Sequence, residues 1–111
     1  MKWVFILLVG ILLVSGCTQQ GGEPPVSEQA KSECIELCKG LSRLLELSDG
    51  PCLSDTQGGG NWIIEDWVCD VAHDPREPVD NLPENQCQEF REGKAHHFVE
   101  VDPSCEFIKA V

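Results

Sequence analysis

Residues 27–47 read SEQAKSECIELCKGLSRLLEL, and this stretch decides the fold. Its apolar side chains recur every three or four residues, the period of one helix face; they are Ala30, Cys34, Leu37, Cys38, Leu41, Leu44 and Leu45. Ser27 is a candidate N-cap, and Ser48-Asp49-Gly50-Pro51 is typical of a helix stop. The stretch therefore predicts one long amphipathic helix over residues 28–47 that packs on a core.

Two cysteines on this helix constrain how it is held. Cys34 and Cys38 lie four residues apart, which places their Cβ atoms about 5–6 Å apart on one helix face. A disulfide needs about 3.5–4.5 Å between Cβ atoms, so these two cysteines should not bond each other. Each should pair with a later cysteine, so that the helix is fastened twice. The spacing leaves open which later cysteine each one takes.

The chain holds seven cysteines in 111 residues. The core of a domain of this size is expected to give only marginal stability, and oxidising compartments allow such domains to be held by disulfides. Setting Cys17 aside leaves an even set that can pair completely: Cys34, Cys38, Cys52, Cys69, Cys87 and Cys105. We therefore expect three disulfides, and we expect their reduction to unfold the domain.

A strand is predicted over residues 66–72, which are rich in aromatic and β-branched side chains. Trp67, Cys69 and Val71 would share the face that meets the helix, and Asp70 would point away.

Further along the chain, Asn81-Leu82-Pro83-Glu84 has the form of a capping box after the proline-rich loop 75–80. It predicts a short helix that ends before Gly93, and residues 95–101 alternate enough for a second strand. The tail should be docked by Cys105. The expected fold is a small disulfide-rich α+β domain over residues 27–111, with one long amphipathic helix and a second short helix packed on a small β-sheet.

The first 16 residues have the pattern of a secretory signal peptide. Lys2 gives a positive start, and residues 3–14 are apolar throughout apart from Gly10. A helix of that length reaches about 18 Å, well short of the roughly 30 Å hydrocarbon core of a membrane. We therefore expect residues 1–16 to be a removable signal peptide that does not span the membrane.

The residues Val14-Ser15-Gly16-Cys17 resemble the lipobox of prokaryotic lipoproteins. The resemblance implies that Cys17 becomes the lipidated N-terminus, although Val14 stands where leucine is commoner. Residues 17–26 are polar and rich in glycine and proline, which is typical of a flexible tether. The chain is thus expected to be lipid-anchored on the extracytoplasmic face of the cell membrane. The alternative is an ordinary signal peptide that leaves Cys17 as an odd thiol.

Acidic residues outnumber basic ones 19 to 8, for a formal net charge of −11. Nucleic-acid binding needs clustered lysine and arginine, which no stretch supplies, so nucleic acid is not expected as a partner. The same charge would repel anionic lipid headgroups. Attachment to the membrane is therefore expected through the lipid on Cys17 and not through a basic surface.

Histidines and neighbouring acids are the candidates for a metal site, because imidazole and carboxylate are common ligands. The candidates are His73, His96, His97, Asp70 and Asp74, with Glu100 and Asp102 as further acids. No two histidines stand four apart on a helix, and the adjacent His96 and His97 should point to opposite faces of a strand. Metal binding through His73, His96 or His97, in a carrier or a metal-dependent enzyme, is therefore the alternative hypothesis, and no cofactor is expected.

Catalysis finds little support in the sequence. Thiol chemistry is disfavoured because no Cys-x-x-Cys pair is present, and no serine sits in the glycine pattern of a hydrolase nucleophile. No catalytic residue is assigned. By elimination, we expect a binding or interaction module of the cell envelope that recognises a protein or a small ligand through the loops at residues 73–80 and 96–97.

The runs WVCDVAHDPR (67–76) and GKAHHFVEVD (93–102) resemble an uncharacterised group of small cysteine-rich archaeal lipoproteins. The resemblance covers about residues 30–110 and implies an archaeal cell surface. The group carries no known activity, so the resemblance transfers no functional residue.

Overall fold

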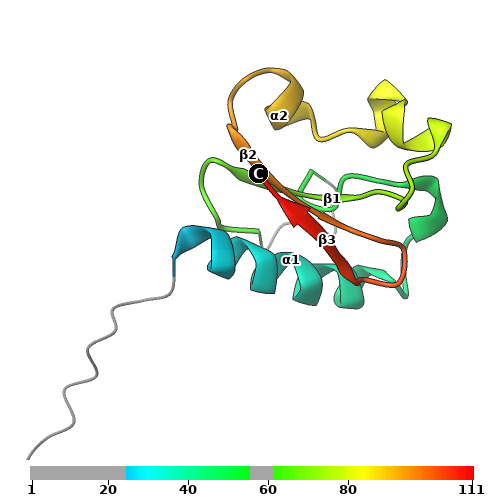
Figure 1. Cartoon of the computed structure of the whole chain (residues 1–111), viewed down its shortest axis with the longest axis horizontal. Coiled ribbons are helices and arrows are strands. Elements are labelled where there is room, and N and C mark those ends of the chain that lie inside the picture. Colours follow the sequence, from blue (N-terminus) through cyan, green and yellow to red (C-terminus); the bar gives the residue numbers. More distant parts are fainter. Residues whose placement is uncertain (1–24, 56–61) are drawn as a thin grey trace, which may run out of the picture.

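The structure is a computed structural model that describes residues 25–55 and 62–111. The helices are α1 (Val26–Leu41) and α2 (Gln88–Arg91), the strands are β1 (Trp67–Val71), β2 (His97–Val101) and β3 (Phe107–Ala110), and the 3₁₀ helices are η1 (Leu47–Asp49), η3 (Pro78–Asn81) and η4 (Pro83–Asn85). Figure 1 shows α1 on one side of the strands and α2 on the other. The expected α+β class is confirmed. The predicted signal peptide, and the predicted tether except for its last two residues, lie outside the described residues.

The three strands form one mixed sheet in the order β1-β2-β3. β1 and β2 run parallel, with Trp67 beside His97 at one end, and β3 pairs antiparallel with β2. Residues 51–54 cover the outer edge of β1, where the Val71 N–H donates to the Pro51 carbonyl oxygen at 3.1 Å. This backbone contact satisfies an edge that would otherwise expose unpaired groups. Both predicted strands are confirmed, whereas β3 was not expected as a strand.

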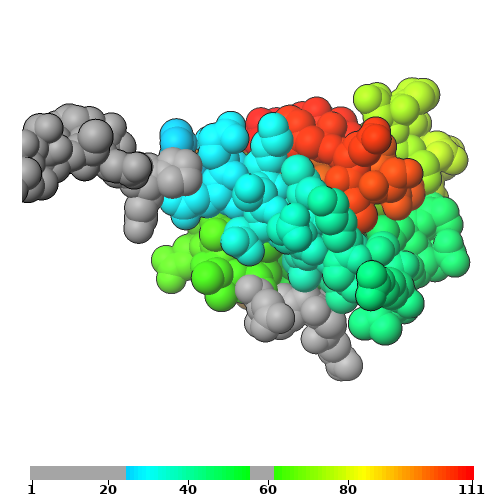
Figure 2. Space-filling view, turned by 90° about the horizontal axis from the view of Figure 1, so that it is seen from below, coloured from blue at the N-terminus to red at the C-terminus, as the bar shows by residue number. Residues whose placement is uncertain are grey.

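Strand alternation sends one set of side chains toward α1. As predicted, Trp67, Cys69 and Val71 lie on this face, and they are buried. The same core cluster contains Val99 and Val101 of β2 and Ala30, Cys34, Cys38 and Leu41 of α1. Figure 2 shows the blue and cyan atoms of α1 lying across the side of the molecule that is turned toward the viewer. The apolar face that the sequence predicts for this helix therefore packs in the core.

Three disulfides hold the domain, as expected: Cys34–Cys69, Cys38–Cys105 and Cys52–Cys87. The first two fasten α1 to β1 and to the turn before β3, so the predicted double attachment of the helix is confirmed. Cys34 and Cys38 do not bond each other. The third disulfide joins the segment at the edge of β1 to the residue before α2.

Helix α1 is shifted from its predicted bounds of 28–47. It begins at Val26, with Pro25 in the cap position that was predicted for Ser27. It ends at Leu41, directly after Gly40, which lowers helix propensity by about 1 kcal/mol. The Ser42 hydroxyl donates to the Lys39 carbonyl oxygen at 2.7 Å, a side-chain contact that competes with further helix.

Because α1 ends early, the burial of the leucines that follow it differs from the prediction. The chain turns, so Leu44 is 77% exposed, and Leu47 enters the core with 6% exposed. The predicted stop at residues 48–51 ends the 3₁₀ helix η1 instead of α1.

The predicted short helix from residue 81 to residue 92 is also wrong in its extent. Only α2, a single turn, is α-helical, and two 3₁₀ helices precede it, the first of them partly inside the predicted loop 75–80. Pro83 disfavours a helical Leu82, which is extended at ψ 133°. The observed capping contact lies four residues earlier than predicted, where Asp80 Oδ2 accepts the Glu77 N–H at 2.8 Å. Three short elements therefore replace one.

The C-terminal tail is docked, as predicted from Cys105. Beyond the disulfide it forms β3, and the Val111 N–H donates to the Phe98 carbonyl oxygen at 3.0 Å.

None of the helices in residues 25–55 and 62–111 combines the length and the hydropathy that crossing a membrane requires.

Gly50 provides a test of the packing between η1 and the loop after β1. It has a left-handed φ of 67°, and a Cβ there would lie 2.5 Å from Asp80 Oδ1 and 3.4 Å from the Val71 carbonyl oxygen. Gly50→Ala should therefore lower the free energy of unfolding by about 2–4 kcal/mol, measured by urea denaturation.

Two other glycines are matched controls for this substitution. Gly93 has a φ of 73° but open space around it, so Gly93→Ala should cost only about 1 kcal/mol. Gly40 lies in α1 with nothing near its Cβ position, so Gly40→Ala should stabilise by about 0.5–1 kcal/mol. Equal losses for the variants at 50 and 93 would contradict the close approach to Asp80.

Candidate functional site

The sheet face turned away from α1, called here the second face, carries charged and apolar side chains next to each other. Alternation places Val68 and Asp70 of β1 and Phe98 and Glu100 of β2 on it. The register sets Asp70 beside Glu100, and β3 sets Lys109 beside Glu100 on the other side. Val68 and Phe98 thus form an apolar row across β1 and β2. Asp70, Glu100 and Lys109 form a row of ionisable side chains across all three strands.

The segment between β1 and β2 folds over the second face without filling the space above it. It leaves a cleft of about 510 Å³, whose wall opposite the strands includes Cys87, Phe90 and Arg91. Small-molecule sites usually measure roughly 300–1,000 Å³. The cleft is therefore large enough for a small ligand, and we take it as the candidate functional site.

Two aromatic rings and two cations line the cleft, and Arg91 Nη1 donates to the Pro83 carbonyl oxygen at 3.5 Å. Phe90 and Phe98 meet edge to face with their centroids 5.1 Å apart, and Lys109 Nζ lies 5.6 Å from the Phe98 centroid. Arg91 and Lys109 are exposed, and neither forms an ion pair with a carboxylate in the described part of the chain. An anion that entered the cleft would find these cations unneutralised.

Asp70 lies on the floor of the cleft and is 9% exposed. Its Oδ1 is buried and has no hydrogen-bond partner among the described residues. Burial raises the pKa of Asp70 to about 8, and the neighbouring carboxylate of Glu100 adds to the increase, while Arg76 opposes it. At neutral pH this carboxyl group therefore carries a proton and can donate a hydrogen bond.

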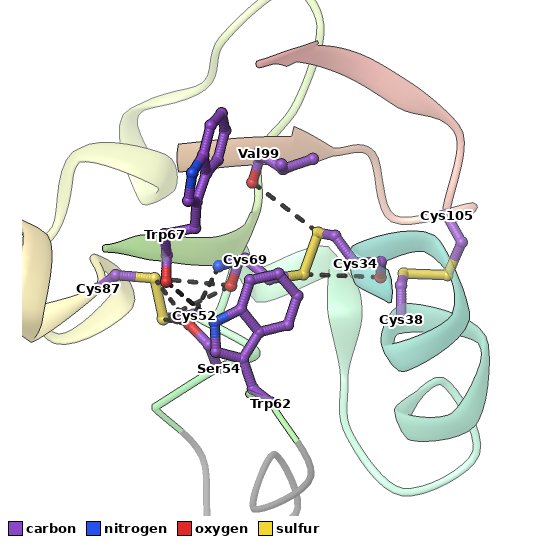
Figure 3. The surroundings of a disulfide bond; sticks show 10 residues. All are labelled: Cys34, Cys38, Cys52, Ser54, Trp62, Trp67, Cys69, Cys87, Val99 and Cys105. Atoms are coloured by element: carbon purple, nitrogen blue, oxygen red, sulfur yellow. Dashed lines mark hydrogen bonds between the residues drawn. A yellow bond between two sulfur atoms is a disulfide. The ribbon is translucent and has the colours of Figure 1, made fainter. Parts of the chain in front are cut away.

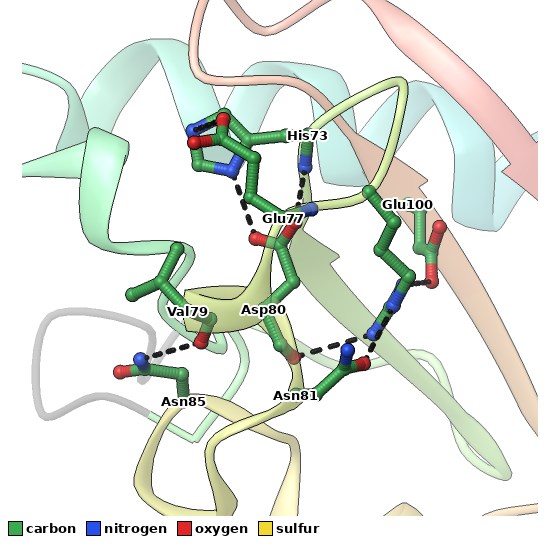
Figure 4. A network of polar contacts seen from close by, with 8 residues as sticks. His73, Glu77, Val79, Asp80, Asn81, Asn85 and Glu100 are labelled. Carbon is green, nitrogen blue, oxygen red and sulfur yellow. Dashed lines mark hydrogen bonds and ion pairs between the residues drawn. The ribbon is translucent and has the colours of Figure 1, made fainter.

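Glu100, the second acid of the floor, is neutralised by Arg76. Arg76 Nη1 lies 2.9 Å from Glu100 Oε1, and the same guanidinium donates to Asn81 Oδ1 at 2.9 Å and to the Asp80 carbonyl oxygen at 3.2 Å. Figure 4 shows Glu100, Asn81 and Asp80 in one polar network. Three acceptors on two segments hold the arginine in place, so the charge of Glu100 is balanced inside the protein.

His73, a predicted metal candidate, lies outside the cleft and joins the loop after β1. Its Nδ1 lies 2.9 Å from Asp80 Oδ1 and its Nε2 lies 3.1 Å from Glu77 Oε2 (Figure 4). Burial disfavours the charged form of Asp80, but hydrogen bonds from the backbone of Glu77 and from His73 outweigh it and hold the pKa of Asp80 below its usual value. Both ring nitrogens are occupied by this network, which gives His73 a structural role.

His96 and His97 meet at a carboxylate that the sequence analysis did not consider. His96 precedes β2, and its Nδ1 contacts Asp66 Oδ1, while His97 Nε2 lies 3.6 Å from Asp66 Oδ2. The prediction placed both histidines on one strand, with their rings on opposite faces, but β2 begins only at His97. Asp66 has a left-handed φ of 68° just before β1. His97 also stacks on Trp67, with the centroids 4.7 Å apart.

The remaining acids of the metal hypothesis do not join the histidines. Asp74 is exposed in the loop after β1, and Asp102 Oδ1 accepts the N–H groups of Ser104 and Glu106 in the turn before β3. In residues 25–55 and 62–111, the potential ligand atoms that lie within 4.8 Å of one another in a set of three belong to Cys52, Asp70 and Cys87. Two of these are sulfurs bonded to each other, so this set offers no thiolate pair to a metal.

Sequence reasoning found Asp70 and Glu100 but missed the residues that make a cleft around them. Alternation along residues 97–101 was sufficient to place Phe98 on the face of Glu100. No signal in the sequence related Arg91 or Lys109 to that face, because one follows an unexpected break in a helix and the other lies on an unexpected strand.

Comparison with known proteins adds no family to this description: no family model, no curated protein and no solved structure matches the chain.

The raised pKa of Asp70 predicts an unusual dependence of stability on pH. Between about pH 4 and pH 8 the folded protein holds a proton on Asp70 that the unfolded chain has lost, so the free energy of unfolding decreases with rising pH, by at most about 1.4 kcal/mol per pH unit from this group. Asp70→Asn removes the titration. We expect it to be more stable than the native chain by on the order of a few kcal/mol at pH 8 and equally stable near pH 4.

Urea denaturation at several pH values measures this difference. The exposed Glu84→Gln is the control, and it should change the curve by less than about 0.5 kcal/mol at every pH. Parallel curves for the native chain and Asp70→Asn would contradict the proposed protonation of Asp70.

Proposed function

We propose that this chain is a lipid-anchored protein of the extracytoplasmic membrane surface, and that its domain is a binding module of the cell envelope. The cleft on the second face is the binding site. Its ligand is a small molecule that has an apolar body and an anionic group.

The observation that carries the proposal is the composition of the cleft opening. In a chain of net charge −11, the exposed Arg91 and Lys109 stand at one opening without a carboxylate partner, next to the rings of Phe90 and Phe98. Cations without a carboxylate partner beside apolar rings favour a ligand that has an anionic group to neutralise the cations and an apolar body to cover the rings. A strongly acidic surface elsewhere would direct an anion toward this opening.

Asp70, on the floor of the cleft, favours a ligand that also has an uncharged polar group. Asp70 has no partner for Oδ1, and its carboxyl group is protonated at neutral pH. The protonated carboxyl group of Asp70, which lines the cleft, favours a ligand with a hydroxyl or carbonyl group that can accept its hydrogen bond. The ligand would thus lie with its anion at the opening and an uncharged polar group at the floor.

The anchor is supported by the lipobox-like residues 14–17 and by the count of cysteines. Six cysteines pair with one another, which leaves Cys17 as the seventh and odd one. A thioether to lipid on Cys17 would use this thiol. Stable attachment would need more than one acyl chain, as lipoproteins carry.

Removal of Cys17 tests the anchor. In a host that processes lipoproteins, we expect the native chain in the membrane fraction with an acylated N-terminus by mass spectrometry, and Cys17→Ser in the soluble or unprocessed fraction without acyl chains. Ser15→Ala keeps a small residue before the cysteine and should behave like the native chain. Identical fractionation of the native chain and Cys17→Ser would refute lipid anchoring.

Binding of 8-anilinonaphthalene-1-sulfonate tests the cleft, because this probe has an aromatic body and one negative charge. We expect saturable binding by fluorescence, and we expect Arg91→Ala and Lys109→Ala each to weaken it about three- to tenfold. The uncharged analogue N-phenyl-1-naphthylamine should bind more weakly and should be insensitive to both substitutions.

Lys39, which lies on α1, supplies the matched control for charge. Its side chain is exposed and contacts Glu36 on the opposite side of the sheet, so Lys39→Ala should leave the affinity unchanged. The cleft is not the anion site if Lys39→Ala weakens the probe as much as Arg91→Ala does.

A further inference from the structure

The disulfide Cys52–Cys87 differs from the other two in what surrounds its sulfur atoms. The disulfides Cys34–Cys69 and Cys38–Cys105 belong to the main core on the α1 side of the sheet, where Cys105 is 7% exposed and the other three cysteines are fully buried, while Cys52 and Cys87 are 6% and 4% exposed. Cys87 instead lines the cleft on the second face. Figure 3 shows Cys52 and Cys87 next to Ser54, away from the two disulfides of α1.

Ser54 holds a hydroxyl group against both sulfur atoms. Its Oγ accepts the Cys69 N–H at 3.0 Å, and it lies 3.5 Å from Cys52 Sγ and 3.8 Å from Cys87 Sγ. A hydroxyl has a single hydrogen to donate. Because the sulfurs of a disulfide carry no hydrogen, the hydroxyl is the donor in either contact.

Asp70 approaches the same sulfurs from the floor of the cleft. A carboxyl oxygen of Asp70, Cys52 Sγ and Cys87 Sγ all lie within 4.8 Å of one another, and Cys52 forms a backbone bridge with Asp70. Burial keeps this carboxyl group protonated up to about pH 8. One disulfide therefore has both a hydrogen-bond donor and a proton donor beside it, and a cleft through which another molecule can reach it.

We propose that Cys52–Cys87 is an exchangeable disulfide that reacts with an extracytoplasmic dithiol, with Asp70 as the proton donor and Ser54 as the hydrogen-bond donor to the departing sulfur. The activity uses the same cleft and the same Asp70 as the anionic ligand proposed above, but it does not require that ligand. The absence of a Cys-x-x-Cys pair does not exclude this activity, because the fold brings together two cysteines that are 35 residues apart in the chain.

The reaction balances as a dithiol–disulfide exchange. A thiolate of the dithiol enters through the cleft and bonds to Cys87 Sγ, and the electron pair of the broken Cys52–Cys87 bond moves to Cys52 Sγ. Asp70 transfers its proton to that sulfur while the Ser54 hydroxyl stabilises the developing negative charge.

The second thiol of the co-reactant completes the cycle. It gives its proton to the Asp70 carboxylate and attacks the other sulfur of the co-reactant, which is bonded to Cys87 Sγ in the mixed disulfide. This attack releases Cys87 Sγ as a thiolate. That thiolate takes up from solvent the proton that the first thiol had released. The co-reactant leaves oxidised to a disulfide, and Cys52 and Cys87 are reduced by two electrons and carry two protons.

The other two disulfides allow the domain to survive this reaction. They keep α1 fastened to β1 and to the turn before β3, so the main core stays closed when Cys52 and Cys87 separate. The smaller buried cluster on the second face, which contains Val68 and Ala95, is the part of the domain that would loosen.

Limited reduction of the purified full chain tests the proposal. The chain is mixed with equimolar dithiothreitol at pH 7 without denaturant, quenched with iodoacetamide at intervals, and digested for mass spectrometry. Cys52 and Cys87 should be alkylated at least about tenfold faster than the four cysteines of the other disulfides. Opening of all three disulfides at one rate, or earlier opening of another one, would overturn the proposal.

Variants separate the proposed chemistry from a merely structural role. Asp70→Asn and Ser54→Ala should each slow the opening of Cys52–Cys87 about tenfold at pH 7, Ser54→Thr should restore the rate, and the exposed Asp66→Asn should leave it unchanged. The ratio of native to Asp70→Asn rates should fall toward one by pH 9, where the native carboxyl has lost its proton. A ratio near one at pH 7, or one that does not change with pH, would contradict the role of Asp70.

Discussion

The arrangement of this domain depends on two disulfides that leave the same face of α1 one helical turn apart. Cys34–Cys69 has a Cα–Cα distance of 5.3 Å and Cys38–Cys105 one of 5.6 Å, and they end on β1 and just before β3. Helix α1 is therefore fixed across the sheet, with the buried Val99 and Val101 of the middle strand beneath it. A disulfide that closes loops of this size contributes about 2–4 kcal/mol, comparable with the net stability of a small domain. This attachment decides which face of the sheet is covered by α1 and which is left to the segment between β1 and β2.

Once α1 occupies one face, strand alternation assigns the chemistry of the other. The side chains at Asp70, Glu100 and Lys109 must then form a row on the second face. The segment that covers this face is irregular, so it closes the space only in part and leaves the cleft. Arg76 neutralises Glu100, and the remaining acid stays protonated beside a disulfide. The binding and exchange chemistry that we propose both arise from this incomplete cover.

Local rules predicted the helix, the existence of strands β1 and β2 and the orientation of Trp67, Cys69 and Asp70, because periodicity and alternation act within a few residues. The same rules ruled out a bond between Cys34 and Cys38 and so predicted the double attachment of α1. They failed where distant segments decide the outcome. The segment from residue 78 to residue 91 breaks into short turns because Pro83 disfavours a helical Leu82 and Cys87 is fastened to Cys52. The proximity of Cys52, Ser54 and Asp70, like the meeting of His96 and His97 at Asp66, is a property of the assembled fold.

The pairing of the six cysteines is the most direct test of this account. Digestion of the unreduced protein at acidic pH, where disulfides do not rearrange, followed by mass spectrometry of the linked peptides, would identify the partners of each cysteine. The account predicts the pairs Cys34–Cys69, Cys38–Cys105 and Cys52–Cys87. A bond from Cys34 or Cys38 to Cys52 or Cys87, or a free thiol among the six, would contradict it, because α1 could not then lie across the sheet and leave the second face open.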